Sequence, residues 1–392
     1  MKKHERIMPK KAIVISIPWE LYKKGGVNTV VKGLLEQFCS NEMELTCVLH
    51  INNWQQGLDY DENHSYSVIR IPTTSWSCCK GFYNKLKFLI YQMPRMYVMW
   101  YLAIKKHNIC AINVHFPTPN SLAFILIGKL FRLKKIYTFH GTDIDQFHET
   151  APKCQKNLVA ERADHVIVSS RSSQERLCIK NPLYADKVTI IPNGVNIEKI
   201  KQSIMLDRKD LIVQKPYFIN IATYEPQKGQ DILLKAFSQL CNVLDNFEHK
   251  LVFVGRSTPH LNVLKQLANE LEINDRVLFY SDLKHYETMT LLSSAELFLL
   301  ASRQEAFGIV LIEAGALEVP IMAHAVGGIT EIITPNLDGI LVNENTTEEW
   351  EKKLRSFMSR QNEHKELVDH FLKKINKKYG NKNVVNSYIK LV

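Results

Sequence analysis

Residues 297–332 read LFLLASRQEAFGIVLIEAGALEVPIMAHAVGGITEI, and their pattern indicates the class of fold. The apolar run Leu297–Leu300 ends in a polar loop, and an apolar segment of helical length begins near Gly308. A second short run, Ile321–His324, is followed by the pair Gly327-Gly328 and another helix-like segment. Short apolar runs separated by helix-length segments predict βα units and a mostly parallel sheet.

The same alternation covers the rest of the chain in two series. Strand-like runs of the first series are residues 12–17, 45–51, 68–71, 110–114, 135–139, 166–169 and 188–191. A polar, charged segment, residues 201–215, then intervenes, and the second series follows with residues 217–222, 251–254, 277–280, 297–300, 321–324 and 340–342. We expect an α/β protein with two doubly wound, Rossmann-like domains that face each other across a cleft, divided near residue 200.

Composition narrows the class of protein. A chain of 392 residues exceeds what one hydrophobic core usually supports, which also favours two domains. The eight cysteines form no C-x-x-C motif, as expected for free thiols in a reducing cytosol. No stretch reaches the roughly 20 apolar residues that span a bilayer, so we expect a chain that does not cross the membrane. The expected location is the cytoplasm, with peripheral attachment to the inner face of the membrane as a further option. The formal charge of +10 suggests a polyanionic partner.

Two glycine pairs precede helix-like segments just after strands. Gly25-Gly26 follows the first strand, and Gly327-Gly328 follows the run Ile321–His324. Exposed backbone N–H groups and the helix dipole at such a turn favour an anion, typically a phosphate. A flexible turn is the alternative, since the dinucleotide pattern G-x-G-x-x-G is absent.

A histidine and a carboxylate emerge together at the end of another strand. The sequence His140-Gly141-Thr142-Asp143 follows residues 135–139 directly. A neutral imidazole can donate to or accept from a sugar hydroxyl or a phosphate oxygen. A strand-terminating turn with an Asp N-cap is the alternative.

Two glutamates eight positions apart flank the start of the helix expected near Gly308. Glu305 lies in the preceding loop, and Glu313 lies within the helix among apolar neighbours. A carboxylate in so apolar a run suggests a specific task, such as binding two vicinal hydroxyls.

Together these features resemble the retaining glycosyltransferase family 4, whose members have the GT-B fold. The motifs that carry the resemblance are Gly25-Gly26-Val27, His140-Gly141-Thr142-Asp143, Ile191-Pro192-Asn193-Gly194-Val195, Lys228-Gly229, Glu305 with Glu313, and Gly327-Gly328. The resemblance implies an acceptor-binding domain in residues 1–200, a nucleotide-sugar-binding domain in residues 201–375, and a C-terminal helix in residues 376–392 that crosses back.

The implied activity is hexosyl transfer from a nucleotide-diphosphate sugar, UDP-linked, to a glycan, a lipid-linked acceptor or another cell-surface polysaccharide precursor. Family roles imply that His140, Lys228 and Glu305 are catalytic and that Asp143 and Asn193 lie on the acceptor side. The expected donor-binding residues are Gly25, Gly26, Lys228, Arg256, Arg303, Glu305, Phe307, Gly308, Ile309 and Glu313. The nucleotide sugar is a substrate, and neither a cofactor nor a metal is expected. The strings Asp59-Tyr60-Asp61 and Asp143-Ile144-Asp145 are therefore read as chance D-x-D matches.

The chain departs from the family pattern at one position. Family members usually carry Gly-Arg a few residues before the Lys-Gly turn, whereas this chain has Ala222-Thr223. Arg256 or Arg303 could replace the lost charge. The departure leaves weak activity, an unusual donor or a lost function open.

Residues 80–107, KGFYNKLKFLIYQMPRMYVMWYLAIKKH, mix cations with aromatic and aliphatic side chains. This composition suits a helix that lies on an anionic membrane surface. A helix pair packed into the N-terminal domain with a basic outer face is an equal alternative.

Two other functions remain open. A nucleotide-sugar epimerase would use the same two-domain shape without an acceptor. A catalytically silent GT-B protein would act as a partner or glycan-binding scaffold. Nucleic-acid binding is not expected, because no zinc spacing, RNP-like motif or helix-turn-helix accompanies the basic charge.

Overall fold

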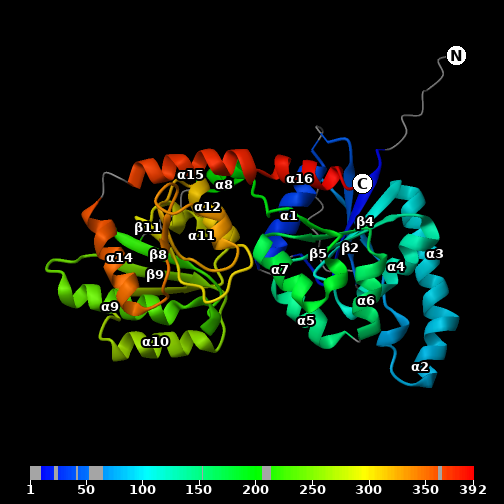
Figure 1. Cartoon of the computed structure of the whole chain (residues 1–392), viewed down its shortest axis with the longest axis horizontal. Coiled ribbons are helices and arrows are strands. Elements are labelled where there is room, and N and C mark those ends of the chain that lie inside the picture. The colour runs from blue at the N-terminus through cyan, green and yellow to red at the C-terminus, as the bar shows by residue number, and fades with distance from the viewer. Residues whose placement is uncertain are drawn as a thin grey trace, which may run out of the picture. The chain divides into compact units, whose positions relative to one another are not determined.

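The computed structural model describes residues 10–21, 25–40, 43–52, 65–151, 153–204, 213–360 and 364–392. The chain divides into two compact units (Figure 1). Unit 1 comprises Met1–Pro192 with Val384–Val392, and unit 2 comprises Asn193–Asn383.

Unit 1 is built on a parallel sheet of seven strands in the order β3-β2-β1-β4-β5-β6-β7. Its strands are β1 (Ala12–Ile17), β2 (Thr46–Ile51), β3 (Ser67–Arg70), β4 (Ile109–His115), β5 (Lys134–Phe139), β6 (His165–Val168) and β7 (Val188–Ile190). The order reverses between β1 and β4, which makes the sheet doubly wound. β1 is buried along its whole length, as its sequence AIVISI requires of a central strand.

The helices of unit 1 cover both faces of this sheet. They are α1 (Gly26–Phe38), α2 (Phe82–Lys87), α3 (Met93–His107), α4 (Ala123–Phe131), α5 (Thr142–Thr150), α6 (Lys153–Arg162) and α7 (Arg171–Lys180). The C-terminal helix α16 (Asn381–Ile389) brings Tyr388 against Phe38 of α1, with ring centroids 6.5 Å apart. On the other face Trp100 of α3 is completely buried and donates to Thr73 Oγ1 at 3.1 Å.

Unit 2 is built on a parallel sheet of six strands in the order β10-β9-β8-β11-β12-β13. Its strands are β8 (Tyr217–Ile221), β9 (Lys250–Gly255), β10 (Val277–Ser281), β11 (Leu297–Leu300), β12 (Ile321–His324) and β13 (Ile340–Val342). Its helices are α8 (Ile197–Ser203), α9 (Gln230–Val243), α10 (His260–Glu270), α11 (His285–Ser293), α12 (Ile309–Ala316), α13 (Ile329–Ile332), α14 (Thr347–Ser359) and α15 (His364–Lys378).

Two apolar clusters hold the helices of unit 2 on opposite faces of the sheet. One joins the sheet to α8, α11, α12, α13 and α15, and the other joins it to α9, α10 and α14 (Figure 1). α12 packs tightly on α15, because a Cβ on Gly315 would lie 2.3 Å from the Phe371 ring. Contact with α15 therefore holds α12 in position. Glu313 lies on α12, and Glu305 lies in the loop that precedes it.

The structure confirms two doubly wound Rossmann-like domains, and each expected strand is present within a residue or two at its ends. The division falls at 192/193 rather than at 200/201. α8 accounts for the difference, since it packs in the cluster of unit 2 and Val195 pairs with Gly380. At the C-terminus, the return to unit 1 begins at Val384 rather than at residue 376. None of the described helices is long and apolar enough to cross a bilayer.

Candidate functional site

The first cluster of polar side chains lies at the carboxyl edge of the sheet in unit 2. β8, β11 and β12 are neighbouring parallel strands, so the loops after them meet at one edge. The loop after β8 contributes Lys228, and the loop after β11 contributes Ser302 and Glu305. Lys228 Nζ lies 2.9 Å from Glu305 Oε2, and Ser302 Oγ donates to the same oxygen at 3.3 Å. Two of the three expected catalytic residues are thus in direct contact.

Glycines let the backbone of this cluster pack closely. A Cβ on Gly229 would lie 2.0 Å from the Ala301 carbonyl oxygen, and one on Gly327 would lie 2.0 Å from that of Glu305. Gly328 N–H donates to the Glu305 carbonyl at 3.0 Å. The Gly327-Gly328 pair therefore supports the backbone that presents Glu305. The pair also directly precedes α13, as expected of a glycine turn that opens a helix.

Glu313 lies inside α12, as expected, and its side chain is only 7% exposed. Its Oε1 is 2.8 Å from His285 Nε2 at the start of α11. α12 begins after Gly308, whose φ of 84° is left-handed, and it has neither a side-chain cap nor an acidic residue in its first turn. The backbone N–H groups of such a helix end are oriented to bind an anion.

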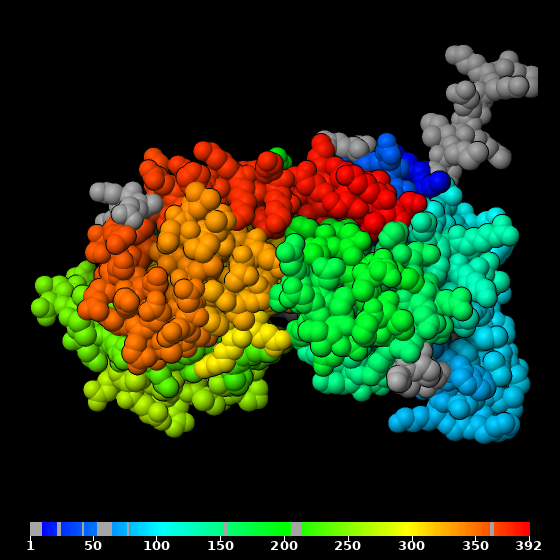
Figure 2. Space-filling model, in the orientation of Figure 1, coloured from blue at the N-terminus to red at the C-terminus, as the bar shows by residue number. Residues whose placement is uncertain are grey.

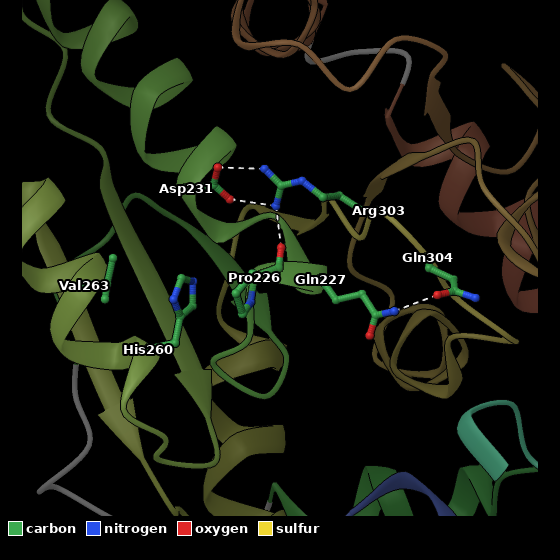
Figure 3. A pocket seen from close by; sticks show the side chains of 7 residues that line it. All are labelled: Pro226, Gln227, Asp231, His260, Val263, Arg303 and Gln304. Carbon is green, nitrogen blue, oxygen red and sulfur yellow. Dashed lines mark hydrogen bonds and ion pairs between the residues drawn. The ribbon is translucent and has the colours of Figure 1, made fainter. Parts of the chain in front are cut away.

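The two arginines proposed to replace the family arginine both have carboxylate partners. Arg303 makes two hydrogen bonds to Asp231, at 2.9 and 2.7 Å, and a further one to the Pro226 carbonyl (Figure 3). Burial opposes the charge of Asp231, but the Arg303 guanidinium holds the pKa of that carboxyl below its ordinary value. Arg256 is exposed and lies 3.5 Å from Glu225.

A hollow of about 520 Å³ adjoins Arg303 (Figure 3). Its lining residues are Pro226, Gln227, Asp231, His260, Val263, Arg303 and Gln304. Lys228, Glu305 and Glu313 do not line it, so this hollow is separate from the ion-pair cluster.

The second cluster lies in unit 1, where β5 ends at His140. Asp143 is completely buried, and its carboxylate accepts hydrogen bonds from the backbone N–H groups of His140 and Gly141 at 2.7 to 3.0 Å. Burial raises the pKa of Asp143 to about 7, although these N–H groups favour its charged form. The geometry therefore shows Asp143 shaping the turn that holds His140.

His140 is stacked on a second histidine that the sequence analysis did not single out. His115, the last residue of β4, lies with its Nδ1 2.9 Å from His140 Nε2, and the ring centroids are 5.1 Å apart. Burial lowers the pKa of His140 to about 4 and that of His115 well below its ordinary value. Both rings are therefore neutral at physiological pH.

The remaining expected site residues lie at the starts of helices, at the start of unit 2 or in the hydrophobic core. Gly25 is the N-cap residue of α1 and makes no side-chain hydrogen bond to the helix. A Cβ at this position would meet no described atom within 4 Å. Gly26 begins α1, Ile309 begins α12, and Asn193 is the first residue of unit 2. Phe307 is buried, with its ring 5.9 Å from Tyr379, so its side chain belongs to the core.

The D-x-D string Asp143-Ile144-Asp145 forms no metal site with other described residues. Asp59-Tyr60-Asp61 lies outside the described residues. Asp145 pairs with Arg176 and with Lys180 of α7. In the described ranges, no three His, Cys, Asp or Glu side chains are grouped so as to hold a metal ion.

The sequence analysis missed His115, its neighbour Asn113 and His285. A weak signal existed for the first two, since Asn113 and His115 are polar residues at alternate positions of a strand that is otherwise apolar. Alternate residues of a strand lie on the same face of the sheet, and His115 is the last residue of this strand. His285 has no comparable pattern, because its contact with Glu313 spans 28 residues.

Two family models match the sequence, one over each half of the chain. The model described as Glycosyltransferase Family 4 matches residues 24–199, and that described as Glycosyl transferases group 1 matches residues 204–374. A similar relative is the N-acetyl-alpha-D-glucosaminyl L-malate synthase of Bacillus anthracis, 25% identical over 72% of this chain and 74% of that protein. Another is the D-inositol 3-phosphate glycosyltransferase of Mycobacterium sp. (strain KMS), 27% identical over 52% of this chain and 46% of that protein.

Solved structures agree with the fold. A glycosyltransferase from Rickettsia africae superposes with a TM-score of 0.78 at 19% identity, with 97% of each chain covered. HepE of Anabaena, crystallised with UDP, gives a TM-score of 0.74 at 16% identity, with 97% of this chain and 98% of that chain covered. The protein is thus a glycosyltransferase with the GT-B fold. The chain belongs to the group 1 glycosyltransferases of family 4.

Proposed function

We propose that this protein catalyses a retaining transfer of a hexosyl group from a UDP-sugar to a glycan, a lipid-linked acceptor or another precursor of a cell-surface polysaccharide. HepE of Anabaena has been crystallised with UDP and with UDP-glucose, which supports a uridine donor by analogy. The reaction proceeds without a metal ion, because backbone dipoles and Lys228 supply the positive charge that the leaving diphosphate needs.

The observation that carries this proposal is the arrangement at the start of α12. Lys228 and Glu305 lie in contact beside a helix end that has no side-chain cap, and Glu313 is buried within the same helix. A diphosphate fits the helix end and Lys228. A polyol fits the carboxylates, with Glu305 binding hydroxyls of the sugar and Glu313 those of the ribose.

His140 supplies a neutral dipole for the sugar in the same proposal. Its pKa of about 4 keeps the ring uncharged, so it can donate a hydrogen bond to a hydroxyl without repelling a developing cation. The transition state of glycosyl transfer resembles an oxocarbenium ion, which carries positive charge at the sugar.

Nucleotide calorimetry in EDTA tests the donor site. We expect UDP to bind more tightly than GDP or ADP, and Lys228→Ala and Glu313→Ala to weaken its binding at least about tenfold, the loss of one charge-assisted hydrogen bond. Lys201→Ala is the matched control, because Lys201 forms an exposed ion pair with Glu318. Absence of nucleotide binding would contradict the proposal and favour the silent scaffold. If a divalent metal is needed, the metal-independent mechanism is wrong.

Product stereochemistry tests the retaining mechanism. With a UDP-α-sugar, the ¹H NMR spectrum taken early in the reaction should show an α-linked product. A β-linked product would refute retention. Conversion of the donor to an isomeric nucleotide sugar without transfer would favour the epimerase alternative, which the relatives do not support.

We also propose that unit 1 docks on an anionic membrane surface, where a lipid-linked acceptor would be found. The docking surface is formed by residues 80–107, and Figure 2 shows α2 and α3 in light blue at one margin of unit 1. Phe82 is 83% exposed, Tyr91 70% and Leu102 60%. The segment contains six lysines or arginines and no acidic residue.

Part of this segment packs into unit 1, and part of it is exposed and available to the proposed membrane surface. Met96, Trp100 and Ala103 of α3 are buried in unit 1, whereas α2 has no buried residue. Exposed Leu126 and Leu130 of the neighbouring helix α4 extend the apolar area. An apolar face rimmed by cations suits the interface of an anionic bilayer.

Vesicle sedimentation tests this surface. We expect the protein to sediment with phosphatidylglycerol vesicles but not with phosphatidylcholine vesicles, and the double variant Phe82→Ser/Tyr91→Ser to lose this binding. Val263→Ser is the control, since Val263 is also apolar and exposed, to 56%, but lies in unit 2. Unchanged sedimentation of the double variant would refute the proposed surface.

A further inference from the structure

A chain of side-chain hydrogen bonds leads from the interior of unit 1 to His140. Thr138 Oγ1 donates to Asn113 Oδ1 at 2.8 Å, and Asn113 Nδ2 lies 2.9 Å from His115 Nε2. His115 Nδ1 lies 2.9 Å from His140 Nε2. Asn113, His115 and Thr138 are all buried. We name these four residues the imidazole relay.

The donors and acceptors of the relay allow one direction of hydrogen bonding. Because the Asn113 oxygen accepts from Thr138, its NH₂ group must donate, and His115 Nε2 must accept. The neutral His115 ring then carries its proton on Nδ1 and donates it to His140 Nε2.

The end of the relay determines which atom of His140 is available to a ligand. With its Nε2 accepting from His115, the neutral His140 ring must carry its proton on Nδ1. Nδ1 has no hydrogen-bond partner among the described residues, and it is not one of the buried polar atoms that lack a partner. Solvent, or a substrate, can therefore reach it.

We propose that Asn113 and His115 are positioning residues that fix His140 in the Nδ1–H tautomer, so that His140 presents a hydrogen-bond donor to the donor sugar and cannot act as a base. The ring has one lone pair in this tautomer, on Nε2, and His115 occupies it. This inference rests on the proposed function for the contact between His140 and the sugar, but the tautomer itself does not.

The relay has a consequence for the mechanism. His140 cannot take the proton from an attacking acceptor hydroxyl, so that proton must go to another group, of which the leaving phosphate oxygen is one. A fixed donor aimed at a sugar hydroxyl also requires no reorganisation during the reaction.

Long-range ¹H–¹⁵N NMR of the protein labelled with ¹⁵N-histidine tests the tautomer directly. The resonances of His140 and His115 are assigned by comparison with His140→Gln and His115→Gln. We expect both rings to show a protonated Nδ1 and a bare Nε2 at pH 7. A protonated Nε2 on His140 would overturn the proposal.

The variant Asn113→Leu tests the cause, because it removes the amide but keeps a similar volume. We expect His140 to leave the pure Nδ1–H state, and kcat for nucleotide-sugar turnover to fall about 10- to 100-fold with little change in KM. His50→Gln is the matched control, since His50 is also a buried neutral histidine and contacts neither ring. Thermal unfolding checks that both variants fold. An unchanged tautomer in Asn113→Leu would overturn the assignment of Asn113.

The two readouts separate this inference from the proposed function. If the tautomers are as expected and no nucleotide sugar is consumed, the relay stands and the transferase proposal is wrong. If sugar is transferred while His140 carries its proton on Nε2, the transferase proposal stands and the relay is wrong.

Discussion

Replacing Gly327 with alanine should disable the enzyme through Glu305, which the new side chain would displace. The added Cβ would lie 2.0 Å from the Glu305 carbonyl oxygen, whereas real Cβ contacts are essentially never below 3.0 Å. The backbone of Glu305 or of residue 327 must therefore move by about 1 Å, which would disturb the contacts of Glu305 with Lys228 and Ser302. A displacement of this size can cost about 100-fold in rate, or about 2.7 kcal/mol of transition-state stabilisation.

The substitution has a second cost, which concerns folding. Gly327 has φ of 53°, and alanine in this left-handed region costs about 1 to 2 kcal/mol. Gly81→Ala is a matched control, because Gly81 also has positive φ, at 79°, but a Cβ there meets nothing within 4 Å. Gly81→Ala should lose at least as much thermal stability from the backbone, because φ of 79° with ψ of 156° is a conformation that essentially only glycine adopts, and only Gly327→Ala should lose activity.

The assay is steady-state turnover of the preferred nucleotide sugar in solution, together with thermal unfolding of each variant. We expect kcat/KM of Gly327→Ala to fall about 100-fold while the protein remains folded at the assay temperature. A folded Gly327→Ala that keeps kcat/KM within threefold of the wild type would refute the reasoning that this glycine positions Glu305.

Three further predictions concern binding, reactivity and stability. If Glu313 binds ribose hydroxyls, 2′-deoxy-UDP should bind about 10-fold or more weaker than UDP in calorimetry, and Glu313→Ala should abolish this difference. The Cys47 thiol, by hydrogen bonding, lowers the pKa of Cys39 to about 6, so alkylation of Cys39 followed by mass spectrometry should show a midpoint near that pH. Cys47→Ala should move the midpoint upward. The hydrogen bond from Cys47 stabilises the folded protein when Cys39 is a thiolate, so this contribution should be lost as the pH falls through about 6 and the thiolate is protonated. Trp100→Ala should lower the free energy of unfolding by about 3 to 5 kcal/mol in urea titration, because Trp100 is completely buried.

The fold was predictable because its strands are short, apolar and separated by helices. Each expected strand lies in one of the two sheets, and even the start of α12 follows from the glycine before it. The domain boundary was less predictable. α8 has the polar composition of a linker but packs on unit 2 through Ile200, and one buried residue is too weak a signal in a sequence.

The candidate site was predictable only where function depends on residues at strand ends. His140 follows β5 directly, and Lys228 and Glu305 lie in the loops after β8 and β11, so their positions could be inferred from the topology of parallel sheets. Their partners could not be inferred in this way. The contact of His115 with His140 and that of His285 with Glu313 depend on side chains brought together by folding across 25 and 28 residues.

The contacts of Arg303, Arg256 and Lys228 determine how readily each cation can bind a diphosphate. Arg303 is held by Asp231 and by the Pro226 carbonyl, so binding a phosphate would require it to give up two hydrogen bonds to a carboxylate. Arg256 is freer to move, because its contact with Glu225 is exposed and 3.5 Å long. Lys228 is already beside Glu305, and an incoming diphosphate must compete with that carboxylate for its ammonium. Binding of the sugar hydroxyls to Glu305 would weaken this competition, so the intact nucleotide sugar should profit more from Lys228 than the free nucleotide does. Because Thr223 stands where the family resemblance implies an arginine, we expect the protein to depend more strongly on this coupling between sugar and diphosphate.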